Sequence, residues 1–413
     1  MKVMTTLDLD FIRSQFPAFS EPSLEGFAHF ENAGGSYACG QAIDWLNRYY
    51  RQTKVQPYYD FPASLEAGEQ MDTARQRMAA WLGIGEDEMH FGPSTSQNTY
   101  VLAQALRQEL APGDEVIVTN QDHEANIGVF SRLEDDGITV REWKIDPDTA
   151  ELNPMDLETL LSERTRVVAF THCSNVVGSI NPVREITDLV REAGGISIVD
   201  GVSFCPHGLP DVPSLGADVY MFSLYKVYGP HLGAMYIRNG LNAELPYQGH
   251  FFNAASPGKR FTPAGPDHAQ IAAVNGLMDY LDSVYDHHYE GPASAPEKAS
   301  AVRELFRNHE TVLLQPLLDY LSDHPRVKMI GKDVAPARAP TVAFTAEGHT
   351  SHELAASLSQ FGLGVGVGDF YAYRLVEALG YDIEDGVIRT SFVHYTSPEE
   401  IERLINALDR LLP

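Results

Sequence analysis

The stretch DVYMFSLYKVYGPHLGAMYIR, residues 218–238, combines two short apolar runs with a lysine between them. Residues 219–222 and 235–237 are typical of buried strands. Gly229 and Pro230 favour a tight connection between them rather than a helix. This pattern places Lys226 on a loop at a strand end, where loss of water lowers the pKa of an amine and makes it a nucleophile. The alternative interpretation is a surface lysine on a hairpin.

A carboxylate ends the preceding apolar run. Residues 196–199 are typical of a strand, and Asp200 follows directly. A carboxylate and a lysine at the carboxyl ends of two neighbouring strands form the pair that pyridoxal phosphate requires. The amine forms a Schiff base with the cofactor, and the carboxylate keeps the pyridine nitrogen protonated. Asp200 and Lys226 together therefore predict a pyridoxal phosphate site.

Ordered motifs along nearly the whole chain carry a resemblance to a known family. They run from FENAGGS, residues 30–36, to VIRTSFVHYTSPEEIERL, residues 387–404. With these motifs, the chain resembles the class V aminotransferases, which are fold type I pyridoxal phosphate enzymes, and most closely their cysteine desulfurase-like branch. The resemblance implies an α/β fold, with a mainly parallel, seven-stranded sheet in a large domain and a small C-terminal α/β domain. We assign residues 20–265 to the large domain, and residues 1–19 and 266–413 to the small one.

Repeated strand–helix–strand units also favour a mainly parallel sheet, whose ligands lie at the carboxyl ends of the strands. Helices are expected over residues 71–82 and 99–109, among others. The resemblance implies that Lys226 and His123 are catalytic, with His123 stacked on the cofactor ring. It implies that Arg389 and Asn175 orient the substrate carboxylate. The expected cofactor-binding residues are Thr95, Ser96, Asn175, Asp200, Ser203, Ser223 and Tyr225, of which Thr95, Ser96, Ser223 and Tyr225 hold the phosphate.

Several of these residues also have ordinary structural interpretations. Thr95 and Ser96 precede a helical pattern, where hydroxyls cap helices as readily as they bind a phosphate. His123 follows an apolar run, and a lone histidine is often structural. Arg389 could be an arginine at a strand edge, although a guanidinium suits a planar carboxylate.

The chain departs from the family pattern at four places. The desulfurases carry a persulfide-forming cysteine in the region of GLGVGVGDFYAY, residues 362–373, but this chain has no cysteine between residues 206 and 413. Gly265-Pro266 replaces a Gly-Thr whose hydroxyl reaches the partner subunit's cofactor. Ser203 and Tyr225 stand where the family often has Gln and His. These differences affect sulfur transfer, the cross-subunit contact and the electronic surroundings of the cofactor.

Composition limits the remaining classes of function. The chain has 413 residues, of which 44% are hydrophobic and 21% are charged, as in a soluble globular protein of two domains. Its net charge of −27 disfavours nucleic acid and anionic membranes as partners. No apolar run is long enough for a transmembrane helix, and the N-terminus lacks a signal-peptide pattern, so we expect a cytoplasmic protein. The three cysteines form no metal-binding pattern, and no metal is expected.

We therefore expect a pyridoxal phosphate-dependent enzyme that acts on a small amino acid and, as the resemblance implies, forms a homodimer. The first choice of reaction is β-elimination from a cysteine-like substrate. Transamination or epimerisation is the second. A protein of this fold that binds cofactor or ligand without turnover is an alternative of another class. The sequence specifies neither the substrate nor the leaving group.

Overall fold

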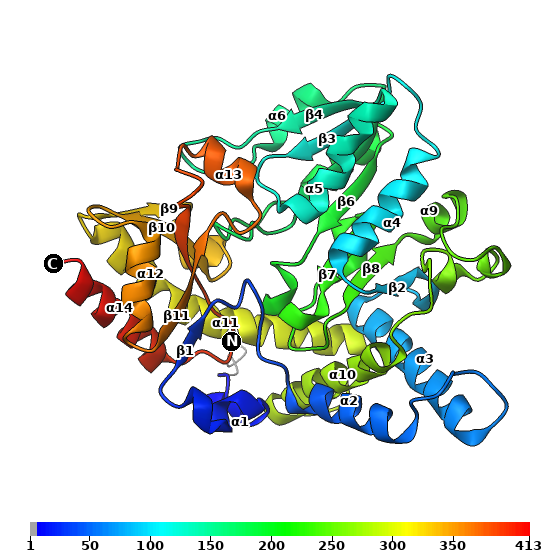
Figure 1. The fold of residues 1–413 in the computed structure, drawn as a ribbon, viewed down its shortest axis with the longest axis horizontal. Coiled ribbons are helices and arrows are strands. Elements are labelled where there is room, and N and C mark those ends of the chain that lie inside the picture. The colour runs from blue at the N-terminus through cyan, green and yellow to red at the C-terminus, as the bar shows by residue number, and fades with distance from the viewer. Residues whose placement is uncertain (1–5) are drawn as a thin grey trace.

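A computed structural model describes residues 6–413 and contains two β-sheets with helices packed around them (Figure 1). Within these residues, the larger sheet has seven strands in the order β2-β8-β7-β6-β5-β3-β4. They are β2 (Met89–Gly92), β3 (Glu115–Thr119), β4 (Thr139–Trp143), β5 (Thr165–Thr171), β6 (Ile196–Asp200), β7 (Val219–Ser223) and β8 (Gly233–Ile237). Strand β8 runs antiparallel to its neighbours β2 and β7, and the other neighbouring pairs are parallel. The expected mainly parallel, seven-stranded sheet is confirmed.

The register of the central strands brings their carboxyl ends to one edge of the larger sheet. Thr171 in β5 pairs with Asp200 in β6, and Asp200 pairs with Met221 in β7. Strand β7 ends two residues later, at Ser223. These strands are buried along most of their length, as expected for a sheet covered on both faces. Polar residues that follow them are therefore brought close together.

A smaller sheet lies on the left in Figure 1. Its strands, in spatial order, are β1 (Ala28–Phe30), β11 (Leu363–Gly368), β12 (Val387–Ser391), β10 (Thr341–Ala346) and β9 (Val327–Ile330). Strand β1 pairs in parallel with β11, so a segment near the start of the chain completes a sheet built from its end. The division of the chain between residues 265 and 266 stays a prediction. Residues 1–5 of the predicted segment 1–19 lie outside the described residues.

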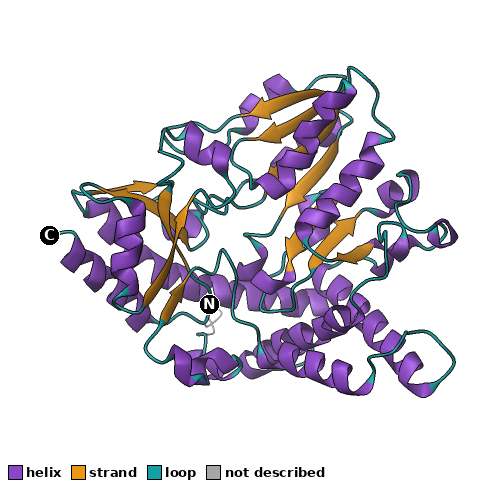
Figure 2. Cartoon of the chain, in the orientation of Figure 1, coloured by secondary structure: helices purple, strands orange, loops and turns teal. Residues whose placement is uncertain are grey.

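Helices flank both sheets (Figure 2). Helix α10 packs against α2 and α3, and α11 contacts α3, α10, α14 and β9, which links the two parts of the chain. None of the helices within residues 6–413 has the length and apolar character needed to cross a lipid bilayer. The helices are α1 (Leu9–Ser14), α2 (Gly40–Gln52), α3 (Pro62–Leu82), α4 (Thr95–Arg107), α5 (Glu124–Ser131), α6 (Pro154–Leu160), α7 (Val183–Glu192), α8 (Val212–Leu215), α9 (Asn239–Glu244), α10 (His268–His288), α11 (Ala295–Asp323), α12 (Ser351–Ser359), α13 (Tyr373–Ala378) and α14 (Pro398–Leu411).

Two helices begin earlier than the sequence pattern indicated. Helix α3 starts at Pro62 rather than at residue 71, because proline is well tolerated in the first turn of a helix. Helix α4 starts at Thr95 rather than at residue 99. The Ser94 side chain caps α4 by accepting a hydrogen bond from the backbone N–H of Gln97 at 3.2 Å. Thr95 and Ser96 therefore belong to the first turn of α4, not to the loop before it.

Candidate active site

Lys226 lies just beyond the carboxyl end of β7, as the last residue of a short 3-10 helix, η6 (Leu224–Lys226). It is 7% exposed, which excludes the interpretation as a surface lysine. Burial and the positive charge of Arg389 lower the pKa of the Lys226 amine to about 8, while the carboxylates of Asp200 and Glu31 act in the opposite direction. A substantial fraction of this amine is therefore neutral near physiological pH, as a nucleophile requires.

Asp200 ends β6 and is almost completely buried. Its Oδ1 accepts a hydrogen bond from the backbone N–H of Val202 at 2.8 Å. Burial raises the pKa of Asp200 to about 6, although this hydrogen bond and the charge of Lys226 lower it. A buried carboxylate with an elevated pKa gains from a cationic partner, and a protonated pyridine nitrogen is such a partner.

The amino-terminal end of α4 faces the end of β7. The hydroxyls of Thr95 and Ser223 lie 2.7 Å apart and share a hydrogen bond, and both residues are buried. Ser96, the second residue of α4, is exposed. The backbone N–H groups in the first turn of a helix lack partners within that helix, and the helix dipole favours an anion there. The Ser94 cap uses only the N–H of Gln97, so the earlier N–H groups of this turn remain available to a phosphate.

His123 caps helix α5, because its Nδ1 accepts a hydrogen bond from the backbone N–H of Ala125 at 3.0 Å. Burial lowers the pKa of His123 to about 4, and the charges of Lys226 and Arg389 add to this effect. The ring is therefore neutral at pH 7, and its proton is on Nε2. Its centroid lies 5.2 Å from that of the Tyr371 ring, at an angle of 35°. His123 thus has a structural role in addition to its place in the cavity.

Asn175 and Arg389 are joined to the loop after β11. Asn175 Nδ2 donates a hydrogen bond to the backbone oxygen of Phe370 at 2.9 Å, and Arg389 Nη1 donates one to the backbone oxygen of Asn175 at 2.8 Å. Arg389 also pairs with Glu31, and its Cζ lies 3.7 Å from the centroid of the Phe370 ring. The two residues predicted to orient a carboxylate are therefore in direct contact.

One cavity gathers nearly all of the predicted site residues. Its empty volume is about 440 Å³, its open mouth included. Arg389 does not line this cavity but contacts Asn175, which does. The lining residues that the sequence predicted are Thr95, Ser96, His123, Asn175, Asp200, Ser203, Ser223, Tyr225 and Lys226, and the others are Ala125, Thr171 and Val202.

Sequence reasoning missed the contacts that Glu31, Phe370 and Tyr371 make with the predicted site residues. Glu31 belongs to the FENAGGS motif, which served only as part of the family resemblance. Phe370 and Tyr371 belong to the glycine-rich stretch that lacks the cysteine of the desulfurases. Their backbones are left-handed, with φ of 55° and 58°, which is unusual for bulky residues. Asp369 supports this turn locally, because its Oδ1 accepts a hydrogen bond from the backbone N–H of Tyr371 at 2.8 Å.

The chemistry of the cavity fits pyridoxal phosphate. It offers a desolvated amine, a carboxylate at the neighbouring strand end and a helix amino terminus beside two hydroxyls. In addition, Asn175 Oδ1 is buried and has no hydrogen-bond partner among the described residues, so a donor on a bound molecule would satisfy it. Within residues 6–413, no cluster of three or more His, Cys, Asp or Glu residues is arranged to hold a metal ion.

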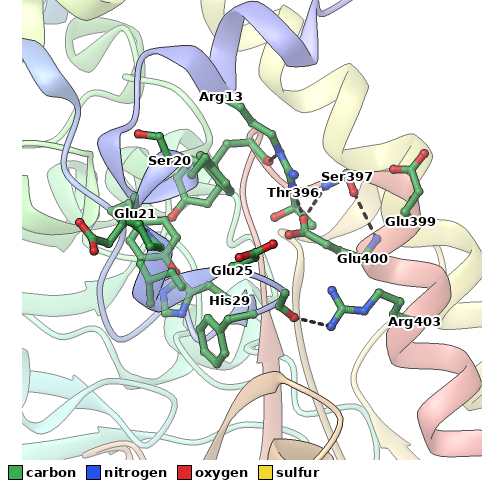
Figure 3. Close-up of a pocket in the computed structure, with 18 residues that line it drawn as sticks. Arg13, Ser20, Glu21, Glu25, His29, Thr396, Ser397, Glu399, Glu400 and Arg403 are labelled. Atoms are coloured by element: carbon green, nitrogen blue, oxygen red, sulfur yellow. Dashed lines mark hydrogen bonds and ion pairs between the residues drawn. The ribbon is translucent and has the colours of Figure 1, made fainter.

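A larger cleft, with an empty volume of about 1400 Å³, lies elsewhere and contains none of these residues (Figure 3). It is bounded by the segment after α1, by β1 and by the start of α14. Its Arg13 pairs with Glu400, and its Arg403 donates hydrogen bonds to the backbone oxygens of Gly26 and Phe361. These cationic groups already have partners, so size alone does not identify the active site.

Comparisons with known proteins agree with the geometry. The family model described as "Aminotransferase class-V" matches residues 28–282 and 300–404. The chain is 35% identical to the aminotransferase-like protein FGM3 of Gibberella zeae, over 99% of both chains. It is 30% identical to the cysteine desulfurase-like protein ustD of Aspergillus flavus, over 98% of this chain and 91% of that protein. The apo cysteine desulfurase of Thermococcus onnurineus NA1 has a similar fold, with a TM-score of 0.86, 22% identity and 98% coverage of both chains.

Proposed function

The chain belongs to the class V aminotransferase family, in its cysteine desulfurase-like branch, and is a pyridoxal phosphate-dependent enzyme; from this premise we propose that it catalyses β-elimination from a cysteine-like amino acid. Membership of this enzyme family argues against the alternative that the protein binds cofactor or ligand without turnover. The observation that carries the proposal is the buried Lys226 amine, with a pKa of about 8, in one cavity with Asp200 and the start of α4.

In this proposal, Lys226 Nζ would hold the cofactor, and the same amine moves the α-proton of the substrate. Asp200 would pair with the pyridine nitrogen of the cofactor, and the neutral His123 ring would contact the cofactor ring. Arg389 and Asn175 hold the substrate carboxylate, so that the bond to be broken at Cα is correctly oriented. Bound pyridoxal phosphate supplies the electron sink for this chemistry. The first turn of α4 with Thr95, Ser96, Ser223 and Tyr225 would hold the phosphate, and Ser203 would contact the cofactor.

The balance of the reaction follows from its bonds. The Cα–H and Cβ–S bonds break, and sulfide leaves with the electron pair of the Cβ–S bond. Addition of water to the remaining three-carbon fragment releases ammonia, so that cysteine and water give sulfide, pyruvate and ammonia. The reaction needs no external oxidant or reductant.

The state of the cysteines supports release of sulfide rather than its transfer to the enzyme. Cys39, Cys173 and Cys205 are all buried and free, and none lines the cavity. Burial raises the pKa of Cys39 and of Cys173 to about 12, and it raises that of Cys205 as well. Because the thiolate is the nucleophile, these protonated thiols are poor acceptors of sulfur.

The test is turnover of L-cysteine by the cofactor-loaded protein, with sulfide, pyruvate and alanine measured together. We expect equal amounts of sulfide and pyruvate. Lys226→Ala should lower turnover by about 10³-fold and remove the covalent link to the cofactor, whereas Lys54→Ala, at an exposed lysine, should do neither. Alanine in place of pyruvate would indicate desulfuration. A keto acid without sulfide, or a racemised amino acid, would indicate transamination or epimerisation.

A further inference from the structure

Arg389, the arginine proposed to hold the substrate carboxylate, already has a carboxylate partner. It lies on β12 and is 2% exposed. Its Nη2 pairs with Glu31, and its Nε donates to Glu31 Oε2 at 3.4 Å. Phe370 covers the face of the guanidinium, and the backbone oxygen of Asn175 accepts from Nη1. Glu31 therefore occupies the Nε–Nη2 edge, which is one of the two edges through which arginine binds a carboxylate with two hydrogen bonds.

The surroundings of Glu31 leave room for its carboxylate at this position. Glu31 directly follows β1 and forms an isolated parallel bridge with Ser391. A Cβ atom added at Gly34 would lie 2.7 Å from Glu31 Oε1, and one added at Gly366 would overlap Oε2. The absence of side chains at both glycines thus creates the slot that the carboxylate fills.

The two partners differ in their access to water. The side chain of Glu31 is 30% exposed, whereas that of Arg389 is 3% exposed. Glu31 is able to regain hydration by a rotation of its side chain, but Arg389 remains buried and needs a negative partner wherever Glu31 goes. A carboxylate from outside has the same charge and the same shape. Its exchange with Glu31 keeps the buried guanidinium neutralised throughout.

We propose that the Glu31 carboxylate occupies the Nε–Nη2 edge of Arg389 until the carboxylate of the substrate displaces it. Glu31 thereby sets the affinity and selectivity for carboxylate-bearing substrates. This inference rests on the proposed role of Arg389 in substrate binding. A neutral molecule cannot displace Glu31, because it offers no replacement charge to the guanidinium. Selectivity is gained at the expense of affinity, since each substrate molecule competes with Glu31.

The inference is tested by calorimetric titration of the cofactor-loaded protein with propionate, which has a carboxylate but no amine to react. We expect Glu31→Gln to lower the Kd for propionate by about tenfold, because the competitor is lost while the side chain keeps its size. Glu31→Asp, which keeps the charge on a shorter side chain, should give an intermediate Kd. Glu25→Gln, at an exposed acid near β1, should leave the Kd unchanged.

Thermal unfolding of the same proteins gives a second reading. Without propionate, Glu31→Gln should unfold at a lower temperature than the wild type, because Arg389 is then buried without a counter-charge. Saturating propionate should raise its midpoint more than that of the wild type. Structural damage alone would weaken binding, so tighter binding distinguishes the proposal from a loss of packing.

A Kd for Glu31→Gln equal to or higher than that of the wild type would overturn the inference. So would a Kd for Glu31→Asp that exceeds the wild-type value. Failure of the proposed function is seen differently: the protein would turn over no amino acid, yet propionate would still bind more tightly to Glu31→Gln.

Discussion

At the scale of single residues, the site is a set of groups whose charged forms are disfavoured by burial. Burial lowers the pKa of Lys226 and of His123 and raises that of Asp200. All three changes bring these groups closer to neutrality within a narrow space. Pyridoxal phosphate carries a negative phosphate and a protonated ring nitrogen. These charges would interact with the start of α4 and with Asp200. Perturbed pKa values of this kind cluster at functional sites.

The pKa of Lys226 predicts how cofactor attachment depends on pH. The neutral amine is the nucleophile, so the rate at which added pyridoxal phosphate bonds to the apoprotein should rise by about tenfold between pH 6 and pH 7. It should level off above pH 8, because the pKa of Lys226 is about 8. Stopped-flow absorbance from pH 6 to pH 10 measures this profile.

The same measurement on Asp200→Asn provides a check. The negative charge of Asp200 raises the pKa of Lys226, so its removal should shift the midpoint of the profile to lower pH. A profile that is still rising between pH 9 and pH 10 would mean that Lys226 keeps the pKa of an exposed lysine.

At the scale of elements, the connection from α9 to α10 is the segment best suited to meet a second copy of the chain. Phe251 and Phe252 form a short 3-10 helix there and are 79% and 68% exposed. Contiguous exposed apolar groups are a feature of interaction surfaces. Gly265 and Pro266 line a separate apolar cavity beside the start of α4. The homodimer implied by the family resemblance stays a proposal, and this connection is where we expect its interface.

We expect the wild type to be a dimer and the double substitution Phe251→Asp, Phe252→Asp to be a monomer. Two carboxylates buried at an interface without partners would cost more than the aromatic contacts contribute. Light scattering coupled to size exclusion measures the mass. Val312→Asp, at a residue 73% exposed on α11, is the matched control and should remain dimeric. A monomeric wild type, or a dimeric double variant, would show that this segment does not form a dimer interface.

At the scale of the whole molecule, the site depends on how the two sheets are held together. Arg338 is completely buried before β10 of the smaller sheet. It donates hydrogen bonds to the backbone oxygens of Val177 and Thr341, each at 2.7 Å, and to that of Lys332. Val177 lies in the loop after β5, two residues beyond Asn175. The guanidinium therefore fixes a loop of the larger sheet, and with it Asn175, against the smaller sheet.

Arg338→Lys should lower the free energy of unfolding by about 3 kcal/mol. A single ammonium cannot reach all three carbonyl groups, which the planar guanidinium does. Unfolding by urea, followed by circular dichroism at pH 7, measures the difference. Arg51→Lys, at an exposed position on α2, should change the stability by no more than about 0.5 kcal/mol. An Arg338→Lys variant as stable as this control would show that the guanidinium is not needed to join the two parts.

The sequence was sufficient for the larger sheet and for most of the cavity. Lys226, Asp200 and Asn175 each follow an apolar run, and the carboxyl ends of parallel strands lie at the same edge of a sheet. Short-range patterns therefore predicted which side chains would meet. The starts of α3 and α4 were placed too late, because capping and packing extend helices beyond the clearest part of their pattern. The placement of Thr95 and Ser96 inside the first turn of α4 followed only from the structure.

The amino-acid sequence alone thus determined the type of sheet, the lysine and carboxylate at its edge and the absence of a cysteine from the loop after β11. Only the tertiary structure showed which side chains surround Arg389. Glu31 and Arg389 are 358 positions apart, and their contact requires β1 to complete the smaller sheet beside β11 and β12. The contacts of the loop after β11 with Asn175, which donates to the backbone oxygen of Phe370, likewise join distant parts of the chain. Local patterns report burial and periodicity, but a pair formed across two separate segments exists only once the sheets have assembled.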